Sequence, residues 1–446
     1  MLPLLPDRPV KVVRDPQGKC AARAVKRTVN LMIQRVTAET FNILLGLPGM
    51  AVTEYALERQ GDEPEALHIF CHHKHEVAMC PGCGKISDAL HEPEERCIRH
   101  LAIWGKATYA HFPSRRFGCN HCKKPFTESL SWVESKRRES TAYELQVYEQ
   151  CKHTDQAAVA KREGLHSETV KGIFQRWARR AEKQRQCTRA RCLGVDEISL
   201  RKGHQQFALV LSDLERHCVI AVLPERTQKA FETWLAGLSD GERQSIRLVA
   251  MDMWGPYRGV VHSKLPRAEI VADRFHVIRQ LNDALAKIRR RLQSKADQAS
   301  YALLKGIRWI LVRRRAELKP EEEVKLQLAL DAFPELRTAY LLKERFVMIA
   351  DKIQDRAQAE RFLWAWVCEA QAAGLVQLVK FTQTLQHWWN EFLNYFNEGF
   401  TSAVVEGLNN AIRGVIRRAY GYHVFEHFRL QALVKHGNLP TPIPLI

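Results

Sequence analysis

Two aspartates occupy positions where a carboxylate is costly. Asp196 interrupts the apolar run Leu193-Gly-Val-Asp-Glu-Ile, and Asp252 directly follows Leu248-Val-Ala-Met. A carboxylate in an apolar strand is unfavourable unless it is paired or binds a metal. Two adjacent carboxylates also raise each other's proton affinity, and a divalent cation relieves this repulsion. Their hard oxygen ligands suit Mg²⁺ or Mn²⁺, so the pair predicts a divalent-metal site. The alternative is that each aspartate merely begins a turn.

A third acid, Glu406, lies in a segment with helical periodicity that begins at about Ser402 and ends at Arg418. The expected apolar stripe consists of Val404, Leu408, Ala411, Ile412 and Val415. The expected polar face consists of Glu406, Asn409, Asn410, Arg413 and Arg417. A glutamate on such a face is usually solvated, so periodicity alone assigns Glu406 no role.

Four of the twelve cysteines form two regular pairs, Cys80-Pro-Gly-Cys83 and Cys119-Asn-His-Cys122. Each pair presents two thiolates at a tight turn, and two such turns complete a tetrahedral zinc shell. With strands between the pairs, as at Ala107-Thr-Tyr-Ala-His-Phe, the spacing predicts a zinc ribbon. Four protein ligands leave no open position, so this zinc is structural. Nearby histidines could replace one ligand: His72, His73, His75, His91 and His121. A redox dithiol and a coincidental pairing are the alternatives.

The elements that position these residues follow from the apolar pattern. Residues 192–200, 207–212 and 218–223 read as a meander of three strands, and a helix and the strand ending at Asp252 come next. A short segment at Tyr257, a further strand at 269–273 and a helix opening at Phe275 complete the series. This is the order of an RNase H-like sheet, in which the first and fourth strands are neighbours. Asp196 and Asp252 would then face each other.

The segment from Thr154 to Phe174 has the rhythm of a helix-turn-helix. Its first helix ends at Gly164, Ser167 is placed to cap the second helix, and the apolar positions Val170, Ile173 and Phe174 pack inward. The exposed side of the second helix could enter a major groove with His166, Lys171 and Gln175. An ordinary helical hairpin is the alternative.

The net charge of +18 indicates a polyanionic partner. It is unevenly spread, because residues 274–319 contain thirteen Lys or Arg against three acids. With 46% hydrophobic residues the chain can form packed cores, which excludes global disorder. The sequence contains no run of eighteen apolar residues, so we expect no membrane span. The apolar N-terminal residues are too few and too rich in proline for a secretory signal. We expect a cytoplasmic protein.

Several motifs together resemble the transposases of the ISL-three family of insertion sequences. The resemblance covers residues 41–435, with the motifs in the family's order. The motifs, besides the helix-turn-helix, are Cys80-Pro-Gly-Cys-Gly, Arg115-Arg-Phe-Gly-Cys-Asn-His-Cys-Lys-Lys-Pro-Phe-Thr-Glu, Leu193-Gly-Val-Asp-Glu, Ala250-Met-Asp-Met-Trp-Gly-Pro-Tyr, Ala272-Asp-Arg-Phe-His-Val, Val405-Glu-Gly-Leu-Asn-Asn and Arg418-Ala-Tyr-Gly-Tyr-His-Val-Phe-Glu-His-Phe-Arg.

The resemblance implies a DDE triad of Asp196, Asp252 and Glu406 that holds two Mg²⁺ or Mn²⁺ ions. It implies hydrolysis of DNA at the element's ends, followed by joining of the freed 3′-hydroxyl to target DNA. The partners would be double-stranded terminal inverted repeats and target DNA, without a membrane. The resemblance also implies that the protein is bacterial and nucleoid-associated. Bringing two ends together would require a homo-oligomer. Asn410 and Arg413 could contact the phosphate backbone, and Asp273, Arg274 and His276 could lie near the site without being ligands.

The predicted fold is multidomain α/β. It comprises a basic extension of unknown role at 1–40, a zinc-ribbon domain at 41–130, a helix-turn-helix domain at 139–187 and an RNase H-like DDE domain at 190–435 with a helical insertion at about 280–395. Two functional alternatives stay open. One is a DNA-binding regulator whose transposase-like domain is inactive. The other is a tyrosine recombinase, in which Tyr301 follows the pattern His276-Val-Ile-Arg279.

Overall fold

The computed structural model describes residues 12–14, 20–22, 42, 45–60, 63–91, 93–185, 189–201, 206–397, 403–419 and 421–443. The chain divides into two compact units, Met1–Val147 with Pro444–Ile446, and Tyr148–Ile443. Most of the predicted basic extension lies outside the described residues. Within it, β1 (Val12–Arg14) pairs antiparallel with β2 (Cys20–Ala22).

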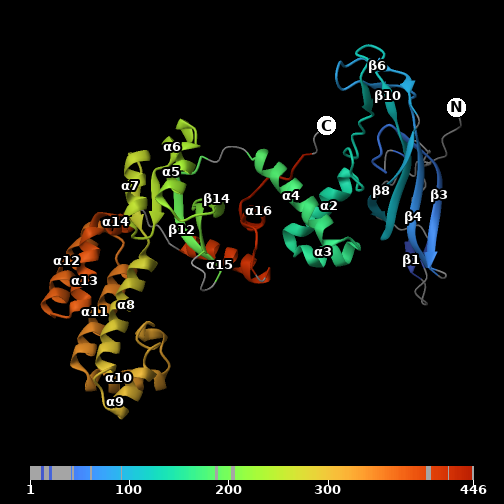
Figure 1. The fold of residues 1–446 in the computed structure, drawn as a ribbon. Helices are drawn as coiled ribbons and strands as arrows, with labels where there is room; N and C mark the ends of the chain where they lie inside the picture. Colours follow the sequence, from blue (N-terminus) through green and yellow to red (C-terminus); the bar gives the residue numbers. More distant parts are fainter. Residues whose placement is uncertain are drawn as a thin grey trace. The chain divides into compact units, whose positions relative to one another are not determined.

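The first unit contains a four-stranded sheet of order β3-β4-β9-β8 (Figure 1). Its strands are β3 (Met50–Gln60), β4 (Glu63–His73), β8 (Glu94–Ile103) and β9 (Lys106–Ser114). β4 and β9 are parallel, whereas the other pairs are antiparallel. Alternate residues of these strands, including Ile69, Ile98 and Phe112, form a core on one face of the sheet. The predicted strand between the cysteine pairs, at residues 107–112, is confirmed as part of β9.

Short hairpins carry the cysteine pairs. β5 (Ala78–Met79) pairs with β6 (Ile86–Ser87), and a small sheet has the order β11-β10-β7. Its strands are β7 (Ala89–Leu90), β10 (Arg116–Gly118) and β11 (Pro125–Thr127). The rings of Phe117 and Phe126 stack at 5.7 Å and pack beside the cysteines. This aromatic pair therefore supplies the apolar support of the two turns.

Three helices follow, α2 (Thr141–His153), α3 (Gln156–Glu163) and α4 (Ser167–Lys183). Asp155 caps α3, which ends at Gly164 in the left-handed conformation (φ 65°), as predicted. The predicted cap of α4 is wrong by one residue, because Nδ1 of His166 accepts from the N–H of Glu168 and helical backbone begins at Ser167. Val170, Ile173 and Phe174 are buried, as their spacing predicted.

A five-stranded sheet of order β14-β13-β12-β15-β16 forms the centre of the second unit (Figure 1). β12 (Cys192–Arg201), β13 (Gln206–Asp213) and β14 (Cys218–Leu223) are the predicted antiparallel meander. β15 (Leu248–Met251) is parallel to both β12 and β16 (Glu269–Ala272). The first and fourth of these strands are therefore neighbours, as the sequence predicted.

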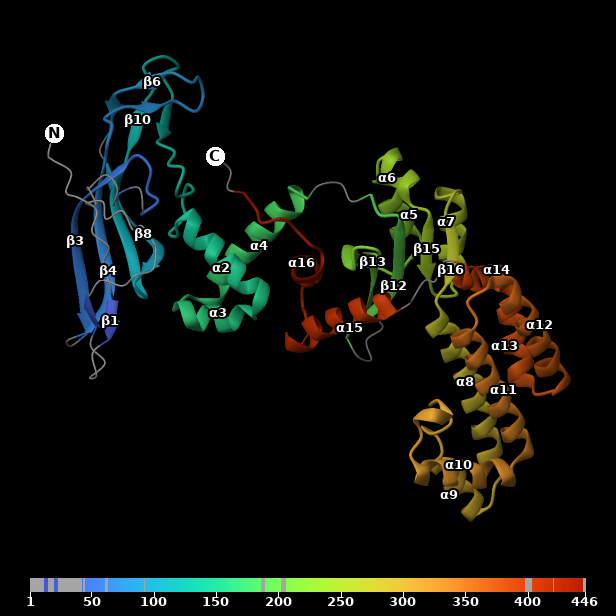
Figure 2. The same cartoon turned by 180° about the vertical axis from the view of Figure 1, so that it is seen from behind.

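Helices cover both faces of this sheet. α5 (Gln228–Ala236) and α7 (Gly255–Lys264) pack on the face of Val195 and Leu209. α15 (Ala403–Arg418) and α16 (Phe425–His436) pack on the opposite face, near Ile198 and Val210 (Figure 2). The predicted short segment at Tyr257 is thus a helix, and α16 is a helix that the sequence pattern did not indicate. A small helix, α6 (Asp240–Ser245), precedes β15.

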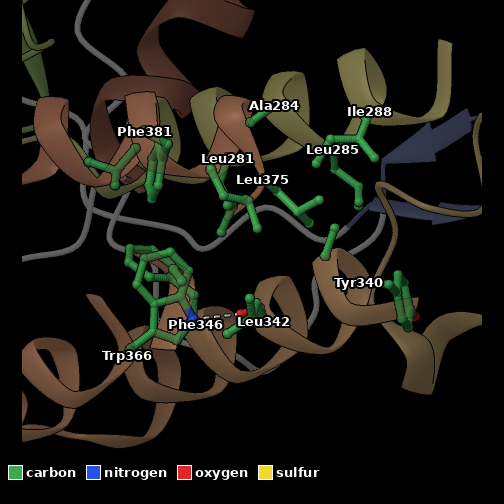
Figure 3. Packing of buried hydrophobic residues seen from close by; sticks show 14 of the residues in the cluster. Leu281, Ala284, Leu285, Ile288, Tyr340, Leu342, Phe346, Trp366, Leu375 and Phe381 are labelled. Atoms are coloured by element: carbon green, nitrogen blue, oxygen red, sulfur yellow. Dashed lines mark hydrogen bonds between the residues drawn. The ribbon is translucent and has the colours of Figure 1, made fainter. Parts of the chain in front are cut away.

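The described residues between β16 and α15 are mainly helical. They form α8 (Arg274–Gln293), α9 (Gln298–Gly306), η1 (Arg315–Glu317), α10 (Pro320–Ala332), α11 (Pro334–Lys352), α12 (Arg356–Ala372), α13 (Val376–His387), α14 (Trp389–Leu393) and η2 (Asn394–Phe396). Leu281, Phe346 and Phe381 belong to their continuous core (Figure 3). The indole Nε1 of Trp366 donates to the Leu342 carbonyl at 2.7 Å, which satisfies its buried N–H (Figure 3). No helix among the described residues is long and apolar enough to cross a membrane.

Candidate active site

Asp196, within β12, and Asp252, directly after β15, follow the last paired residues of these two parallel strands. Val195 pairs with Met251 in the register of β12 and β15. The next residue of each strand is therefore one of the two aspartates. Their predicted juxtaposition is confirmed, and both line the same cleft.

Asp252 is partly buried beside two other carboxylates. Its side chain is 26% exposed, and Oδ1 has no hydrogen-bond partner among the described residues. Nδ1 of His276 lies 3.9 Å from Oδ2, too far for a hydrogen bond. The pKa of Asp252 is raised to about 6, mainly by burial. The neighbouring carboxylates Glu197 and Asp196 contribute to this rise, whereas His276 and Arg279 oppose it. A cation beside this carboxylate would remove the penalty of keeping it ionised.

Asp196 is held from two directions. The backbone N–H of Glu197 donates to its Oδ1 at 2.7 Å, and the side-chain amide of Asn409 on α15 donates to its Oδ2. Asn409 is only 3% exposed, although its spacing predicted the polar face of the helix. The helix turns this asparagine toward the sheet, with Val405 and Ile412 buried on either side of it in sequence.

Glu406 lies one helical turn before Asn409 and is exposed. It lines the same cleft as Asp196 and Asp252, whose volume is about 1020 Å³. The three acids thus converge although more than 150 residues separate Asp252 from Glu406. Basic side chains share this cleft: Arg226, Arg279, Arg413 and Arg417. Asn410 also lines it and accepts from Nη1 of Arg413 at 3.0 Å.

A second carboxylate next to Asp196, that of Glu197, was not predicted as a site residue from the sequence. Glu197 lines the cleft, and its Oε2 lies 2.8 Å from Nη1 of Arg226. The hydroxyl of Tyr257 donates to its Oε1 at 3.5 Å. Alternation along β12 points adjacent residues to opposite faces of the sheet, so this pair of contacts lies on the α7 side. The two adjacent acids Asp196 and Glu197 were the sequence feature that could have indicated this site. The partners of Glu197, Arg226 and Tyr257, are distant in sequence, so the pattern alone did not reveal its role.

The residues after β16 frame the entrance of the cleft. Asp273 caps α8 by accepting from the N–H of Phe275 at 2.8 Å, and Asp273 and His276 both line the cleft. Arg274 forms an ion pair with Asp351. The predicted proximity of Asp273 and His276 to the acids is confirmed, whereas Tyr301 is not among the cleft residues.

The four paired cysteines come together in the first unit. Their Sγ atoms lie within 4.8 Å of one another: Cys80, Cys83, Cys119 and Cys122. This group contains no histidine of the described residues, so the predicted alternative ligands are not needed. His73, for example, contacts the Pro113 carbonyl and Glu128 instead.

Both cysteine turns have the same backbone hydrogen bonds. The N–H of Gly84 donates to the Cys80 carbonyl, and the N–H of Lys123 donates to the Cys119 carbonyl, each at 2.9 Å. Both donor residues have positive φ, 71° and 56°, which the tight turn requires. The N–H of Cys122 donates to Sγ of Cys119 and lowers the pKa of that thiol to about 6. Thiolates arranged in this way suit tetrahedral zinc.

The three predicted DNA-contacting residues of α4 have different surroundings. His166 is exposed and caps the helix. Lys171 and Gln175 are half-buried and line a pocket together with residues of α15 and α16. Nζ of Lys171 also lies 3.1 Å from Glu168. Of the three predicted residues, only His166 is therefore exposed.

Three sequence families match successive parts of the chain. Residues 76–122 match a family described as the zinc-finger of transposase IS204/IS1001/IS1096/IS1165. Residues 128–178 match the helix-turn-helix domain of transposase family ISL3. Residues 193–432, more than half of the chain, match the ISL3 DDE family described as transposase. The presence of a zinc ribbon and of a helix-turn-helix, both predicted from the sequence, is thus confirmed.

Whole-chain relatives agree with these matches. The transposase for insertion sequence element IS1001 of Bordetella parapertussis is 29% identical over 385 residues, which cover 84% of this chain and 94% of the relative. The transposase for insertion sequence element IS1557 of Mycobacterium tuberculosis is 24% identical over 300 residues, covering 61% of this chain and 66% of the relative. This chain belongs to the ISL3 family of insertion-sequence transposases, DNA-binding enzymes that cut and join DNA.

Proposed function

We propose that the cleft lined by Asp196, Asp252 and Glu406 is the catalytic site for cleaving element ends and for strand transfer. The convergence of three acids from β12, β15 and α15 on one cleft with basic walls carries this proposal. We further propose that the five-stranded sheet is an RNase H-like core. The helices α8 to η2 would then be an insertion between its last strand and the helix of Glu406.

The acids suit a pair of divalent cations, Mg²⁺ or Mn²⁺. The orphaned, buried Oδ1 of Asp252 and the mutual repulsion of Asp252, Asp196 and Glu197 are the features that a cation would satisfy. Asp196, Asp252 and Glu406 would be the ligands. Bound there, the cations would activate a water or a 3′-hydroxyl for in-line attack on a phosphodiester and would stabilise the leaving oxygen.

The protein side chains orient the acids and hold the DNA. Asn409 and the N–H of Glu197 each donate to one oxygen of Asp196, which would orient this carboxylate as a metal ligand. Asn410 and Arg413 lie in the cleft wall and would contact the phosphate backbone near the cleaved bond. This arrangement places a positive surface beside an acidic centre, as phosphodiester chemistry requires.

The remaining parts would supply binding specificity and stability. We propose that the helix-turn-helix domain (139–187) recognises the terminal inverted repeats through His166, Lys171 and Gln175, and that a homo-oligomer brings two ends and the target together. The ribbon domain (41–130) would hold one structural zinc on Cys80, Cys83, Cys119 and Cys122. The catalytic domain would span residues 190–435. The residues of the extension at 1–40 do not indicate a role for it.

Incubation with Mg²⁺ and duplexes carrying the element's ends tests the proposal. We expect nicks at the ends and 3′-hydroxyl joining by the wild type, and none by Asp196→Asn, Asp252→Asn or Glu406→Gln. All three variants should bind the same duplex in EDTA as tightly as the wild type. Glu225→Gln, which removes an exposed acid outside the cleft lining, is the matched control and should cleave normally. Normal cleavage by any variant of the trio would remove that residue from the site.

The two alternative functions predict different results. A tyrosine recombinase would leave a covalent adduct through Tyr301. However, α8 separates His276 from Gln293, whose side chain contacts the Tyr301 carbonyl, by about 25 Å. An inactive regulator would bind the ends without cleaving them in either Mg²⁺ or Mn²⁺. The matches to transposases over most of the chain favour the enzyme.

A further inference from the structure

A pocket of about 610 Å³ lies where the second helix of the helix-turn-helix meets the two C-terminal helices. It is separate from the catalytic cleft, because the two share no lining residue. Its walls come from α3 and α4 on one side, and from α15, α16 and the turn between them on the other. None of the residues that line this pocket takes part in the proposed catalytic chemistry.

The charge of the pocket is positive. Lys171, Arg418 and Lys435 line it, and Asp155 is the one acid among the lining residues. The carboxylate of Asp155 is already engaged, since its Oδ1 accepts from the N–H of Ala158 at 2.8 Å. Burial lowers the pKa of Lys435, and the charge of Arg418 lowers it further. The two cations repel each other there, and a bound anion would relieve this repulsion.

Two glutamine amides in the pocket have buried atoms without partners. Gln431 is 7% exposed, and its Oε1 has no hydrogen-bond partner in the described part of the chain. Nε2 of Gln175 is likewise buried and unpaired there. A buried amide atom without a hydrogen-bond partner destabilises the folded protein, and a ligand in the pocket could supply the missing hydrogen bonds. Either amide can present its NH₂ group, because rotation about the last side-chain bond exchanges its oxygen and nitrogen.

The walls of the pocket are tied together. Nη2 of Arg429 on α16 lies 2.8 Å from Oε2 of Glu182 on α4. Nε of Arg179 on α4 lies 3.4 Å from Glu426 on α16. These ion pairs hold the basic residues of α16 at a fixed distance from those of α4. The pocket is therefore preorganised, which lowers the entropic cost of binding a charged group.

We propose that this pocket binds one backbone phosphate of the DNA held by the helix-turn-helix. Lys171, Arg418 and Lys435 would neutralise it, and the amide of Gln175 would donate to one of its oxygens. The proposal rests on DNA being the substrate but not on the identity of the catalytic acids. A backbone phosphate fits the cationic, hydrogen-bond-donating walls and the position beside α4.

The pocket would link DNA binding to catalysis through one rigid helix. Arg418 is the last residue of α15, and Glu406 lies in its first turn. Their separation of twelve positions corresponds to about 18 Å of helix. A phosphate fixed at Arg418 would thereby set the position of Glu406 relative to the same DNA molecule.

Salt-dependent binding of an element-end duplex, measured by fluorescence anisotropy in EDTA, tests this phosphate contact. Arg418→Gln and Lys171→Gln should each weaken binding several-fold and reduce the slope of log K against log salt by up to about one. Because both residues would contact the same phosphate, the slope of log K against log salt in the double variant should also fall by no more than about one. Arg361→Gln, an exposed arginine on α12 outside both cavities, is the matched control and should keep the wild-type slope.

Each other outcome has a defined meaning. Unchanged slopes for Arg418→Gln and Lys171→Gln would overturn the proposal. Inorganic phosphate that raises the Tm of the wild type but not of Arg418→Gln, with unchanged DNA binding, would show a free-anion site and would also overturn it. A change only in oligomeric state would indicate a protein interface instead. The Asp196→Asn variant separates the two proposals. If it fails to cleave DNA but keeps the wild-type slope of log K against log salt, the defect lies in the catalytic acids and not in the phosphate contact.

Discussion

The side-chain amide of Asn409 donates a hydrogen bond to Oδ2 of Asp196, which joins α15 to the central strand β12. The two residues are more than 200 positions apart in sequence. Glu406 lies one turn before Asn409 on the same helix. The bond therefore fixes the approach of α15, and with it Glu406, to the two aspartates.

Removing this amide should impair catalysis more than DNA binding. We expect Asn409→Ala to lower the cleavage rate about 10- to 100-fold and to raise the Mg²⁺ concentration needed for half-maximal rate, as for other residues that orient metal ligands. Binding to the element end in EDTA should stay unchanged. Asn410→Ala, which alters the exposed neighbour, is the control for helix integrity and should leave the Mg²⁺ dependence in place. Equal Mg²⁺ dependence of Asn409→Ala and the wild type would contradict the orienting role.

The raised pKa of Asp252 predicts a pH-dependent stability difference in metal-free protein. Because the folded-state pKa of about 6 lies above the unfolded value, Asp252 is protonated in the folded protein near pH 4 and costs little stability there. The cost grows as the pH rises from the unfolded pKa to the folded pKa, and above about pH 6 it levels off on the order of 3 kcal/mol. In EDTA, Asp252→Asn should therefore raise the Tm by several degrees at pH 8 and by little at pH 4.

Magnesium should reverse this order. Adding Mg²⁺ at pH 8 should raise the Tm of the wild type but not of Asp252→Asn, because the variant lacks the anionic ligand. Thermal unfolding with and without EDTA at both pH values checks both effects. A variant that is less stable than the wild type at pH 8 in EDTA would show that the burial of this carboxylate is not the dominant cost.

The strand of Asp196 approaches its neighbour closely at Gly194. A Cβ at this position would lie 2.5 Å from Oγ of Ser212 and 2.7 Å from Cδ2 of Leu214. We expect Gly194→Ala to destabilise the protein by about 1–3 kcal/mol through overpacking. Cleavage should fall as well, since β12 must shift two residues before Asp196. Urea unfolding measures the first effect.

The matched control for Gly194→Ala is Gly414→Ala, in the interior of α15. No atom outside its own neighbourhood lies within 4 Å of a Cβ there, so the substitution should be neutral or stabilise the helix by about 0.5–1 kcal/mol. Equal destabilisation by the two substitutions would show that close approach of the strands is not the cause.

The four-cysteine cluster should bind one zinc ion per chain. Cys119→Ser should abolish stoichiometric zinc and lower the Tm of the first unit, because metal binding contributes directly to the folding of such turns. Cys97→Ser changes an exposed cysteine outside the cluster and should retain zinc. Stabilisation of the second unit by Mg²⁺ should persist in Cys119→Ser. Full zinc content in that variant would disprove the four-thiolate site.

Local sequence predicted most of the elements and the chemistry of single motifs. The cysteine spacing, the apolar pattern of the helix-turn-helix and the order of the sheet strands all predicted what the structure contains. Asp196 and Asp252 could be paired from sequence because the strand order predicted that the first and fourth strands are neighbours. Such inferences succeed where the periodicity of a strand or helix determines which side chains share a face.

Tertiary packing decided the rest. The rhythm of α15 placed Asn409 on a polar face, but the helix packs between the sheet and the cleft, so an amide is buried against Asp196. Glu406 reaches the aspartates only because the helices α8 to η2 fold apart from the sheet and return the chain to its edge. The pocket of Lys171 and Arg418 likewise depends on α16, whose weak amphipathic pattern did not reveal a helix. Sequence determined which residues could bind metal, zinc or DNA, whereas contacts between distant segments determined which of them meet, because no local periodicity encodes how separate helices dock.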